Sequence, residues 1–343
     1  MNLKELSDVL GLSPTTVSRA LNGYPEVSAL TRTRVIAAAE KHGYVPNSMA
    51  KRLATGRAMA IGHVVPLSEH DMINPIFADF IAGAGEFYAD AGYNMVLRVV
   101  PMGQEEENTY RAMAGAQTVD GVTVHAPREN DRRIALLTGL GLPFIVHGRS
   151  DGPEGYSWLD MNNRRAFHRA TTYLAELGHR RIALLNGIES MQFARRRRMG
   201  YEDALAEAGL TPDPALIFGA DMTEPYGYHT TRALLAGPNR PTAIMASSLI
   251  TALGISRAIA DAGLVMGRDV SVITHDDAMS FLPNYGEVPL FTTTKSSVRA
   301  AGSRMAELLI DLIEGRVQAP VTELWEAEMI LGSSTGPAPE SPA

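Results

Sequence analysis

The feature that most constrains the fold of this chain is an alternation of apolar runs with amphipathic helical stretches from residue 58 to residue 295. Four helical stretches end alike, in an acidic residue, then Ala or Leu, then Gly, before the chain returns to an apolar run. Glycine just past a helix end, followed by a strand, is typical of the βαβ units of a parallel sheet. The four endings are Asp90-Ala91-Gly92, Glu176-Leu177-Gly178, Glu207-Ala208-Gly209 and Asp261-Ala262-Gly263.

Nine apolar runs are expected to be strands, too many for one small sheet, and they predict two doubly wound parallel-sheet subdomains. Ligands of such folds bind outside the carboxyl ends of the strands. The expected strands are Ala60–Val65, Tyr93–Val99, Gly121–His125, Phe144–His147, Ile182–Leu185, Leu216–Phe218, Ala243–Met245, Val270–Thr274 and Phe291–Thr294. The loops expected to line the crevice follow Val65, His125, His147, Asn186, Phe218, Met245 and Thr274.

Near the start of the chain, residues 13–22 are predicted to form a short capped helix. Ser13 can accept from the free N–H groups of the first turn, and Pro14 fits the first helical position, where a missing N–H costs nothing. One side of this helix is apolar and would hold it against the rest of the protein. The opposite side offers small polar groups and Arg19, which is what a helix needs in order to enter a DNA major groove. A capped surface helix of no special purpose is the alternative. The apolar stripe that would hold the helix down consists of Val17, Ala20 and Leu21.

Helices on either side of this one predict a three-helix head. Two helices joined by a short turn, here containing Gly11, are the helix-turn-helix pattern. Ser28 is expected to cap the third helix and Gly43 to end it. The positions expected to face the core of the head are Leu3, Leu6, Val9 and Leu10 in the first helix and Val35, Ile36 and Ala39 in the third.

After the head, Asn47 and Gly56 bound about two turns of predicted helix. Isolated helices of this length are marginal in water, so a partner or DNA would have to support it. A plain linker is the alternative.

Charge separates a basic head from an acidic body. Residues 1–60 hold eight Lys or Arg against four Asp or Glu, whereas the whole chain carries a net charge of −7. This distribution suits a phosphate-contacting module attached to a body that does not touch DNA. The chain has no cysteine, which excludes disulfides and thiolate chemistry. Because no apolar run could span a membrane and no signal-peptide pattern is present, we expect a cytoplasmic protein.

A search for catalytic motifs predicts neither an enzyme activity nor a cofactor, since no phosphate-binding loop, dinucleotide fingerprint or zinc-protease motif is found. Gly332–Gly336 has the form G-x-S-x-G, but it opens into a Pro-rich end instead of a strand-to-helix turn, so we interpret it as chance. His125, His147 and His275 fall at predicted strand ends. A metal site there is the alternative to ordinary polar loop residues, although no carboxylate lies at ligand spacing beside the first two.

Two charged motifs stand near the expected crevice. Arg195-Arg196-Arg197-Arg198 lies early in a predicted helix, where neighbours point about 100° apart. One or two of these side chains can therefore turn into the crevice, and the alternative is a solvated basic patch. Asp276-Asp277 follows a predicted strand and either binds sugar hydroxyls or caps a turn.

The chain resembles the lactose/galactose-repressor (LacI/GalR) family of transcription regulators over residues 1–335, with head, hinge and body in the order of that family. The resemblance implies a sequence-specific DNA-binding repressor that acts as a homodimer. It also implies a periplasmic-binding-protein-like body that holds a small effector, a mono- or disaccharide, between its subdomains. The matching strings are Leu3–Gly23, Pro46–Leu53, Asn74–Ala78, Leu177–Leu185, Arg197–Tyr201, Gly267–Ile273, Asp276-Asp277 and Thr292–Lys295.

On DNA, the resemblance implies that each subunit lays the helix of residues 13–22 in a major groove of a pseudo-palindromic operator. Pro14 and Thr15 would face base edges, and Arg19 would read sequence, since arginine can donate two hydrogen bonds to guanine. Leu53 matches the wedge that the family inserts into the minor groove. The other residues expected at the DNA are Thr16, Ser18, Asn22, Asn47 and Ala50.

In the body, Arg197 matches the family's effector-binding arginine and Asp276 its carboxylate. The guanidinium would donate to sugar hydroxyls and the carboxylate would accept from them. Implied apolar walls come from Phe77, Phe193 and Met222, and the remaining implied polar residues are His147, Asp160 and Ser247.

Three strings depart from the family's common pattern and leave the effector's identity open. Ser247-Ser248 stands where the family commonly has Asn-Asp, and Asn162-Asn163 where it commonly has Asp-Asn. The third, His147–Arg149, stands where Asp-Arg is common. Together with Trp158–Asp160, it is similar to strings in α-proteobacterial regulators of α-glucoside or related sugar uptake.

The expected plan is an all-α head joined to an α/β body of two doubly wound subdomains. A sugar-binding transport protein and a sugar-modifying enzyme are the alternatives, but the first needs a signal peptide and no basic head, and the second a paired acid and base. No heptad repeat follows Leu331, which favours a dimer over a tetramer. The expected segments are 1–45 for the head, 46–58 for the hinge, 59–160 and 292–320 for the first subdomain, 161–291 and 321–335 for the second, and 336–343 for the end of a disordered tail that begins at Gly332.

Overall fold

The computed structural model describes residues 1–21, 24–44, 56–66, 75–101 and 104–340. The chain divides into two compact units, Met1–Met59 and Ala60–Ala343. The predicted hinge helix lies outside the described residues, as do four of the expected DNA contacts: Asn22, Asn47, Ala50 and Leu53.

The first unit is the predicted three-helix head, made of α1 (Leu3–Leu10), α2 (Pro14–Leu21) and α3 (Ala29–Lys41). Asn2 caps α1 by accepting from the Glu5 N–H, and the Glu5 carboxylate accepts from the Asn2 N–H in return. Gly11 ends α1 in the left-handed conformation at φ 64°, as predicted. The core of the head consists of Leu6, Leu10, Val17, Ala20, Val27, Val35 and Ala39.

Two predicted core positions of the head are wrong. Val9 is 56% exposed and Ile36 is 41% exposed. In three short helices, each helix buries only one narrow stripe. Leu6 and Leu10 occupy that stripe in α1, and Val9 is left on a flank about 100° away.

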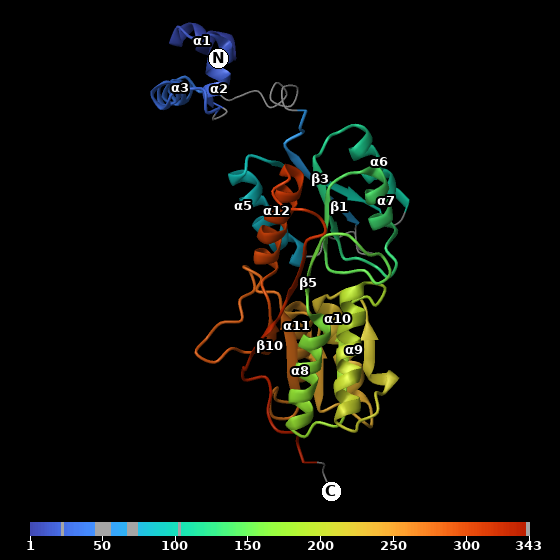
Figure 1. The fold of residues 1–343 in the computed structure, drawn as a ribbon. Helices are drawn as coiled ribbons and strands as arrows, with labels where there is room; N and C mark the ends of the chain where they lie inside the picture. Colours follow the sequence, from blue (N-terminus) through green and yellow to red (C-terminus); the bar gives the residue numbers. More distant parts are fainter. Residues whose placement is uncertain (22–23, 45–55, 67–74, 102–103, 341–343) are drawn as a thin grey trace. The chain divides into compact units, whose positions relative to one another are not determined.

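The second unit contains two six-stranded sheets, which confirms the predicted pair of doubly wound subdomains (Figure 1). Every strand pairing is parallel except that of β10 with β12. The first sheet has the order β11 (Thr322–Trp325), β5 (Trp158–Met161), β4 (Phe144–His147), β3 (Gly121–His125), β1 (Ala60–Pro66), β2 (Asn94–Val100). The second has the order β12 (Glu328–Ile330), β10 (Thr292–Lys295), β9 (Ser271–Asp276), β8 (Ala243–Ala246), β6 (Ile182–Asn186), β7 (Ile217–Gly219).

All nine predicted strands form, but β5, β11 and β12 were missed. These three are short and carry charged or exposed side chains, so they lack the continuous apolar run of a buried central strand. The predicted subdomain boundaries near the end of the chain are also wrong. β10 joins the second sheet and β11 the first, so the two crossings around α12 come after β10 and after β11, and not before each of these strands as predicted.

Helices pack in pairs on the sheets. In the first subdomain α5 (Pro75–Asp90) lies against α12 (Val298–Glu314), as Figure 1 shows. In the second, α8 (Asn163–Glu176) packs on α9 (Gln192–Glu207), and α10 (Glu224–Ala236) on α11 (Leu249–Asp261). The remaining described helices are α6 (Gln104–Gly115), α7 (Arg132–Leu140) and the 3₁₀ turn η1 (Pro214–Leu216). No described helix has both the length and the apolar character needed to cross a membrane.

Glycine allows the α5–α12 pair to approach closely, which gives a stability prediction. A Cβ at Gly302 would lie 2.2 Å from the Phe80 carbonyl oxygen, so Gly302→Ala forces the helix backbones apart. Overpacking of this kind costs about 1–3 kcal/mol of unfolding free energy. Gly139→Ala, in α7, is the matched control, because its Cβ would meet nothing within 4 Å. Urea unfolding should show a loss for Gly302→Ala only, and equal stability of the two variants would contradict the close packing.

The predicted disorder of the C-terminal segment is wrong for the described part, which reaches residue 340. Ser334 is fully buried, and its carbonyl accepts from the Val272 N–H at 2.8 Å. Further on, the Ala338 N–H donates to the Leu177 carbonyl at 2.8 Å. A segment poor in apolar residues can still order by pairing its backbone with a sheet. Because the Ser334 hydroxyl donates to a backbone carbonyl in this buried segment, the interpretation of Gly332–Gly336 as a chance motif is supported.

Candidate functional site

The helix α2 presents the polar face that the sequence predicts. The Ser13 hydroxyl accepts from the Thr16 N–H at 3.1 Å, which confirms the N-cap. Val17 and Ala20 are buried in the head, whereas Pro14 and Arg19 are exposed. Of the other expected DNA contacts, Thr15 is exposed, and Thr16 and Ser18 are half-buried. Contact with DNA stays a prediction for all of these residues.

In the body, Arg197 is the centre of a buried polar cluster. This side chain of α9 is 5% exposed, and its guanidinium lies 5.0 Å from the ring centres of both Phe167 and Phe193. Its Nε donates to Asn163 Oδ1 at 2.7 Å and its Nη1 to the Ser247 carbonyl at 2.6 Å. These contacts fix the plane of the guanidinium and leave Nη2 as the donor that can turn to a ligand. Burial lowers the pKa of Arg197 to about 10, so the group stays charged at neutral pH.

The carboxylate whose charge most raises the pKa of Arg197 is that of Asp277. The sequence did not distinguish this residue from its neighbour in the Asp276-Asp277 motif. Burial raises the pKa of Asp277 to about 6, against the attraction of Arg197. The Oδ2 atom of Asp277 is buried and has no hydrogen-bond partner among the described residues. The predicted Asp276 is buried as well, but its Oδ1 accepts from the Ala278 N–H at 2.7 Å, and its charge interacts with Lys295. The charge of Arg197 therefore acts on the pKa of the second aspartate of the motif, without an ion pair between these two described side chains. Effector binding by Asp276 stays a prediction.

The raised pKa of Asp277 predicts that the stability of the folded protein depends on pH. The folded protein holds the Asp277 proton up to about pH 6, whereas an unfolded chain releases it near the ordinary pKa of 3.8. Stability should therefore fall as pH rises from about 4 to 6, by about 2–3 kcal/mol when complete. Asp277→Asn removes this loss, so its thermal midpoint should exceed that of the wild type at pH 7.5 and approach it near pH 4. Asp203→Asn, which removes a half-buried carboxylate of α9 that bonds to Arg164, is the control. Parallel profiles for all three proteins would contradict the assignment.

Further implied effector residues surround the cluster on the second subdomain. The Ser247 hydroxyl donates to Asn186 Oδ1 at 2.7 Å, which places both at the carboxyl ends of β8 and β6. A Cβ at Gly187 would lie 2.9 Å from Phe193 Cζ and 3.6 Å from Met222 Sδ, so these two apolar side chains border the same loop. Ser247 and Phe193 thus contact Arg197 directly, and Met222 borders the same loop as Phe193. Asn163 and Asn186 were missed, although Asn163 belongs to the noted Asn162-Asn163 departure.

The first subdomain contributes an aromatic cluster and one carboxylate. The ring of Phe80 stacks on His147 at 4.7 Å, and the ring of Phe77 meets His125 edge-on at the same distance. Burial lowers the pKa of His147 to about 4, so the imidazole is neutral at physiological pH. On β5, Asp160 is 3% exposed and accepts from Arg149 Nε at 2.8 Å. Its buried charge also interacts with Arg197, which links the two subdomains electrostatically.

The three strand-end histidines do not converge on a metal site. His125 Nε2 lies 3.1 Å from His63 Nδ1, within the aromatic cluster. His275 instead bonds to the hydroxyls of Thr294 and Ser296, at 3.0 and 3.2 Å. Within the part of the chain that the structure describes, no group of three or more His, Cys, Asp or Glu could hold a metal ion.

The four consecutive arginines of α9 divide their directions as the helical spacing predicts. Arg197 turns into the buried cluster, and Arg198 bonds to Glu189 and Glu202 on its own subdomain. The other two bridge to the first subdomain. Arg195 pairs with Glu129, and Arg196 Nη2 bonds to Asp151 Oδ1 at 2.5 Å. The run is thus neither a single patch nor a single site: it lines the buried cluster and joins the subdomains.

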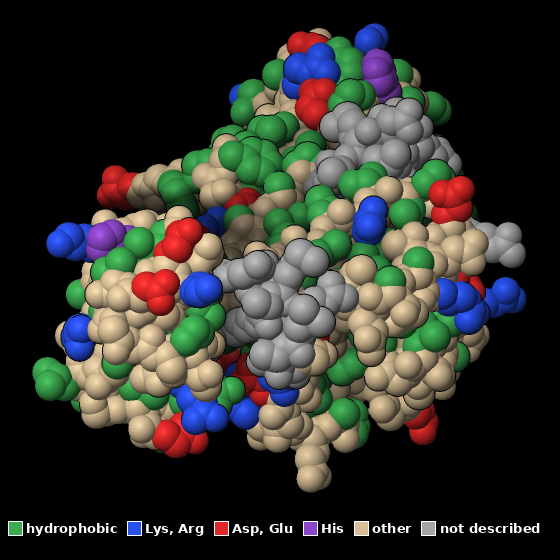
Figure 2. All heavy atoms as spheres, turned by 90° about the horizontal axis from the view of Figure 1, so that it is seen from above, with side chains coloured by type: hydrophobic (Ala, Val, Ile, Leu, Met, Phe, Trp, Pro, Cys, Tyr) green, Lys and Arg blue, Asp and Glu red, His purple; other side chains and the backbone are tan. Residues whose placement is uncertain are grey.

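One face of the molecule shows how its charges are distributed. On the face shown in Figure 2, basic and acidic side chains of the described residues are interspersed instead of gathering in one extended patch. A chain that bound nucleic acid with its whole surface would need a dominant positive field. This face does not provide one.

Two family models match the chain. The model "Bacterial regulatory proteins, lacI family" matches residues 2–47, and the model "Periplasmic binding protein-like domain" matches residues 171–335. The HTH-type transcriptional regulator AglR of Rhizobium meliloti is 48% identical over 342 residues, which cover 99% of this chain and 96% of AglR. The HTH-type transcriptional regulator CelR of Thermobifida fusca is 32% identical and covers 97% of each chain.

Solved structures agree with these sequence relationships. A CelR–cellobiose complex superposes with a TM-score of 0.71 at 30% identity, and covers 97% of this chain and 99% of its own. The lac repressor dimer bound to operator and the anti-inducer ONPF gives a TM-score of 0.79 at 26% identity, and covers 98% of this chain and 99% of its own.

Proposed function

Because this chain belongs to the lacI family of bacterial regulatory proteins, we propose that it is a repressor whose affinity for operator DNA is set by a sugar bound beside Arg197. The observation that carries the effector site is the buried guanidinium of Arg197, which bonds to Asn163 and the Ser247 carbonyl and lies 5.0 Å from two phenyl rings. A preoriented donor of this kind, with carboxylates nearby, matches neighbouring hydroxyl groups.

A carbohydrate is favoured over other small molecules by the mixture of groups around Arg197. Asp160, Asp277 and Asn163 offer acceptors, and Phe193 and Met222 offer apolar walls. The solved CelR structure is a complex with cellobiose, and CelR is similar to this chain along its whole length. We propose a mono- or disaccharide, with an α-glucoside as the first choice among candidates.

For DNA, we propose that α2 enters the major groove with Pro14, Thr15 and Arg19 toward the bases. The exposed polar face of α2 and the buried Val17–Ala20 side support this orientation. The hinge residues Asn47, Ala50 and Leu53 would add minor-groove contacts. The protein would then act in the bacterial cytoplasm, at the nucleoid, by binding and not by catalysis.

We propose a homodimer, since a pseudo-palindromic operator needs two heads related by symmetry. The lac repressor in the similar complex is a dimer on its operator. In this chain, the segment after β9 exposes several large apolar side chains, which a second copy would cover. They are Phe281, Tyr285, Val288 and Leu290. Sedimentation analysis should find a dimer, and a monomer at micromolar concentration would contradict this part of the proposal.

The test of the function is fluorescence anisotropy with a labelled operator fragment at several salt concentrations, with and without sugars. Specific binding should exceed binding to random DNA at each salt concentration, and one sugar should shift it in either direction. Equal affinity for operator and random DNA at every salt concentration would reject the regulator. A thermal-shift screen of mono- and disaccharides identifies the sugar to use, because a ligand that binds the folded state raises its melting temperature.

A further inference from the structure

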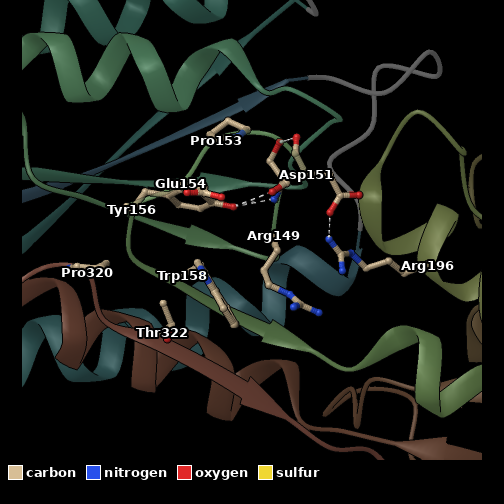
Figure 3. Close-up of a pocket in the computed structure, with 11 residues that line it drawn as sticks. Arg149, Asp151, Pro153, Glu154, Tyr156, Trp158, Arg196, Pro320 and Thr322 are labelled. Carbon is tan, nitrogen blue, oxygen red and sulfur yellow. Dashed lines mark hydrogen bonds and ion pairs between the residues drawn. The ribbon is translucent and has the colours of Figure 1, made fainter.

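A concavity lies outside the Arg197 cluster, beside the edge of the first sheet where β5 pairs with β11 (Figure 3). Its volume is about 300 Å³, at the lower end of the range for small-molecule pockets. Most of its lining comes from the loop between β4 and β5, and Arg196 of α9 closes one side. The lining residues that the following argument uses are Arg149, Asp151, Glu154, Trp158, Arg196 and Thr322.

Arg149 lies between this cavity and Asp160, the carboxylate of the first subdomain that interacts with Arg197. Trp158 and Asp160 are two residues apart on β5, so their side chains lie on one face of the strand. The Nε of Arg149 donates to Asp160 Oδ2 at 2.8 Å, and its guanidinium carbon lies 5.0 Å from the Trp158 ring centre. Arg149 therefore lies between a carboxylate whose charge interacts with Arg197 and the indole that lines the cavity.

Two arginines of the cavity have N–H groups without an acceptor among the described residues. The Nε–H of Arg196 is buried and has no acceptor among the described residues, although Nη2 of the same side chain bonds to Asp151. Buried donors normally have a partner, and an unmet one carries a cost of about 1–3 kcal/mol. Arg149 uses only Nε on Asp160, and no hydrogen bond of its terminal NH₂ groups is found within the described residues. A ligand with several oxygen atoms would satisfy these donors.

The charges of the cavity favour a neutral ligand. The two guanidinium groups are matched by the two carboxylates of Asp151 and Glu154 on the lining. No excess of either sign is left to select an ion. Both donors and acceptors are present, together with the apolar surface of Trp158 and the hydroxyl of Thr322. A pyranose ring, which has hydroxyl groups around its rim and C–H groups on its faces, fits this combination.

We propose that this cavity is a carbohydrate subsite for the second unit of a disaccharide or longer effector whose first unit binds beside Arg197. The inference rests on the proposed function, because it assumes a sugar in the Arg197 cluster. It adds that the effector is longer than one sugar unit. Since Arg196 belongs to the second subdomain and Trp158 to the first, a sugar in the cavity contacts both subdomains. The second unit therefore adds contacts to both subdomains, and favours the arrangement of the subdomains in which those contacts form.

The test compares sugars of one and two units by isothermal titration calorimetry of the full-length protein with glucose, maltose and cellobiose. Trp158→Leu removes the indole, and Thr322→Tyr fills the cavity from the neighbouring strand without changing Trp158. Of the two disaccharides, the one that binds the wild type should bind each variant with a Kd about tenfold higher. The Kd of glucose should stay within twofold of its wild-type value. Met199→Tyr, at a 37% exposed position of α9 that does not line the cavity, is the control and should leave both affinities unchanged.

Each of the other outcomes overturns the inference. Equal affinity of the wild type for glucose and both disaccharides shows that no second unit is bound. Equal weakening of glucose and disaccharide in both variants assigns the cavity a structural role only. If the wild type binds none of the sugars while it still binds operator, the sugar effector itself is rejected and the subsite with it. That outcome differs from the first two, in which sugars bind but the cavity variants do not discriminate between them.

Discussion

Replacing Arg197 with alanine is expected to abolish the response of operator binding to sugar and to leave operator affinity without sugar within about threefold of the wild type. Arg197 is the buried donor of the cluster, and its loss leaves Asp277 without its compensating charge. Removal of one member of a buried charged interaction costs about 2–5 kcal/mol, which corresponds to a loss of sugar affinity of roughly 30-fold or more. Anisotropy of a labelled operator and thermal shifts with the sugar measure the two effects separately.

Arg198→Ala is the matched control, because Arg198 neighbours Arg197 on the same helix but bonds to Glu189 and Glu202 at the surface. It should keep the sugar response. Arg197→Lys retains the charge but cannot reproduce the two directed bonds to Asn163 and the Ser247 carbonyl, so its sugar affinity should be intermediate. An unchanged sugar response of Arg197→Ala would remove this residue from the effector site, and circular dichroism of the variant guards against loss of the fold.

Arg19→Ala is expected to weaken binding to the operator by about 10- to 100-fold and binding to random DNA far less. A bidentate contact from arginine to guanine accounts for about 1–3 kcal/mol of discrimination between bases, whereas phosphate contacts act on all sequences alike. Arg19 is exposed in the last turn of α2, on the side away from Val17 and Ala20. Titrations at two salt concentrations separate the two kinds of contact, since only loss of a phosphate contact changes the salt dependence.

The control for this experiment is Lys41→Ala, in the last turn of α3, which removes a basic side chain of the same head. Its effect should be small and similar for operator and random DNA. If Arg19→Ala also weakens both kinds of DNA equally, Arg19 contacts phosphate and the reading of sequence must fall to other residues, such as Thr15.

Local features of the two candidate sites could be predicted from the sequence, whereas contacts between distant residues could not. The N-cap at Ser13 and the outward face of α2 follow from neighbouring residues alone, and both are found in the structure. The choice of Arg197 as an effector-binding residue followed from a resemblance; the structure buries this side chain, and its contact with an effector stays a prediction. The electrostatic coupling of Arg197 to Asp277 instead of Asp276 did not follow, because successive residues point to opposite sides and only the packing around the end of β9 decides which carboxylate lies near other charges.

The sequence by itself determined the local elements of this protein: nine of its strands, the capped helices, and the division into a basic head and an acidic body. Periodicity, caps and glycine endings act over a few residues, so they can be seen without the fold. Only the tertiary structure decided where distant segments pair. It assigned β10 and β11 to opposite sheets, ordered the segment that buries Ser334, and brought Arg149, Trp158 and Arg196 to one cavity. Those arrangements depend on hydrogen bonds and packing between residues far apart in the chain, which no local pattern specifies.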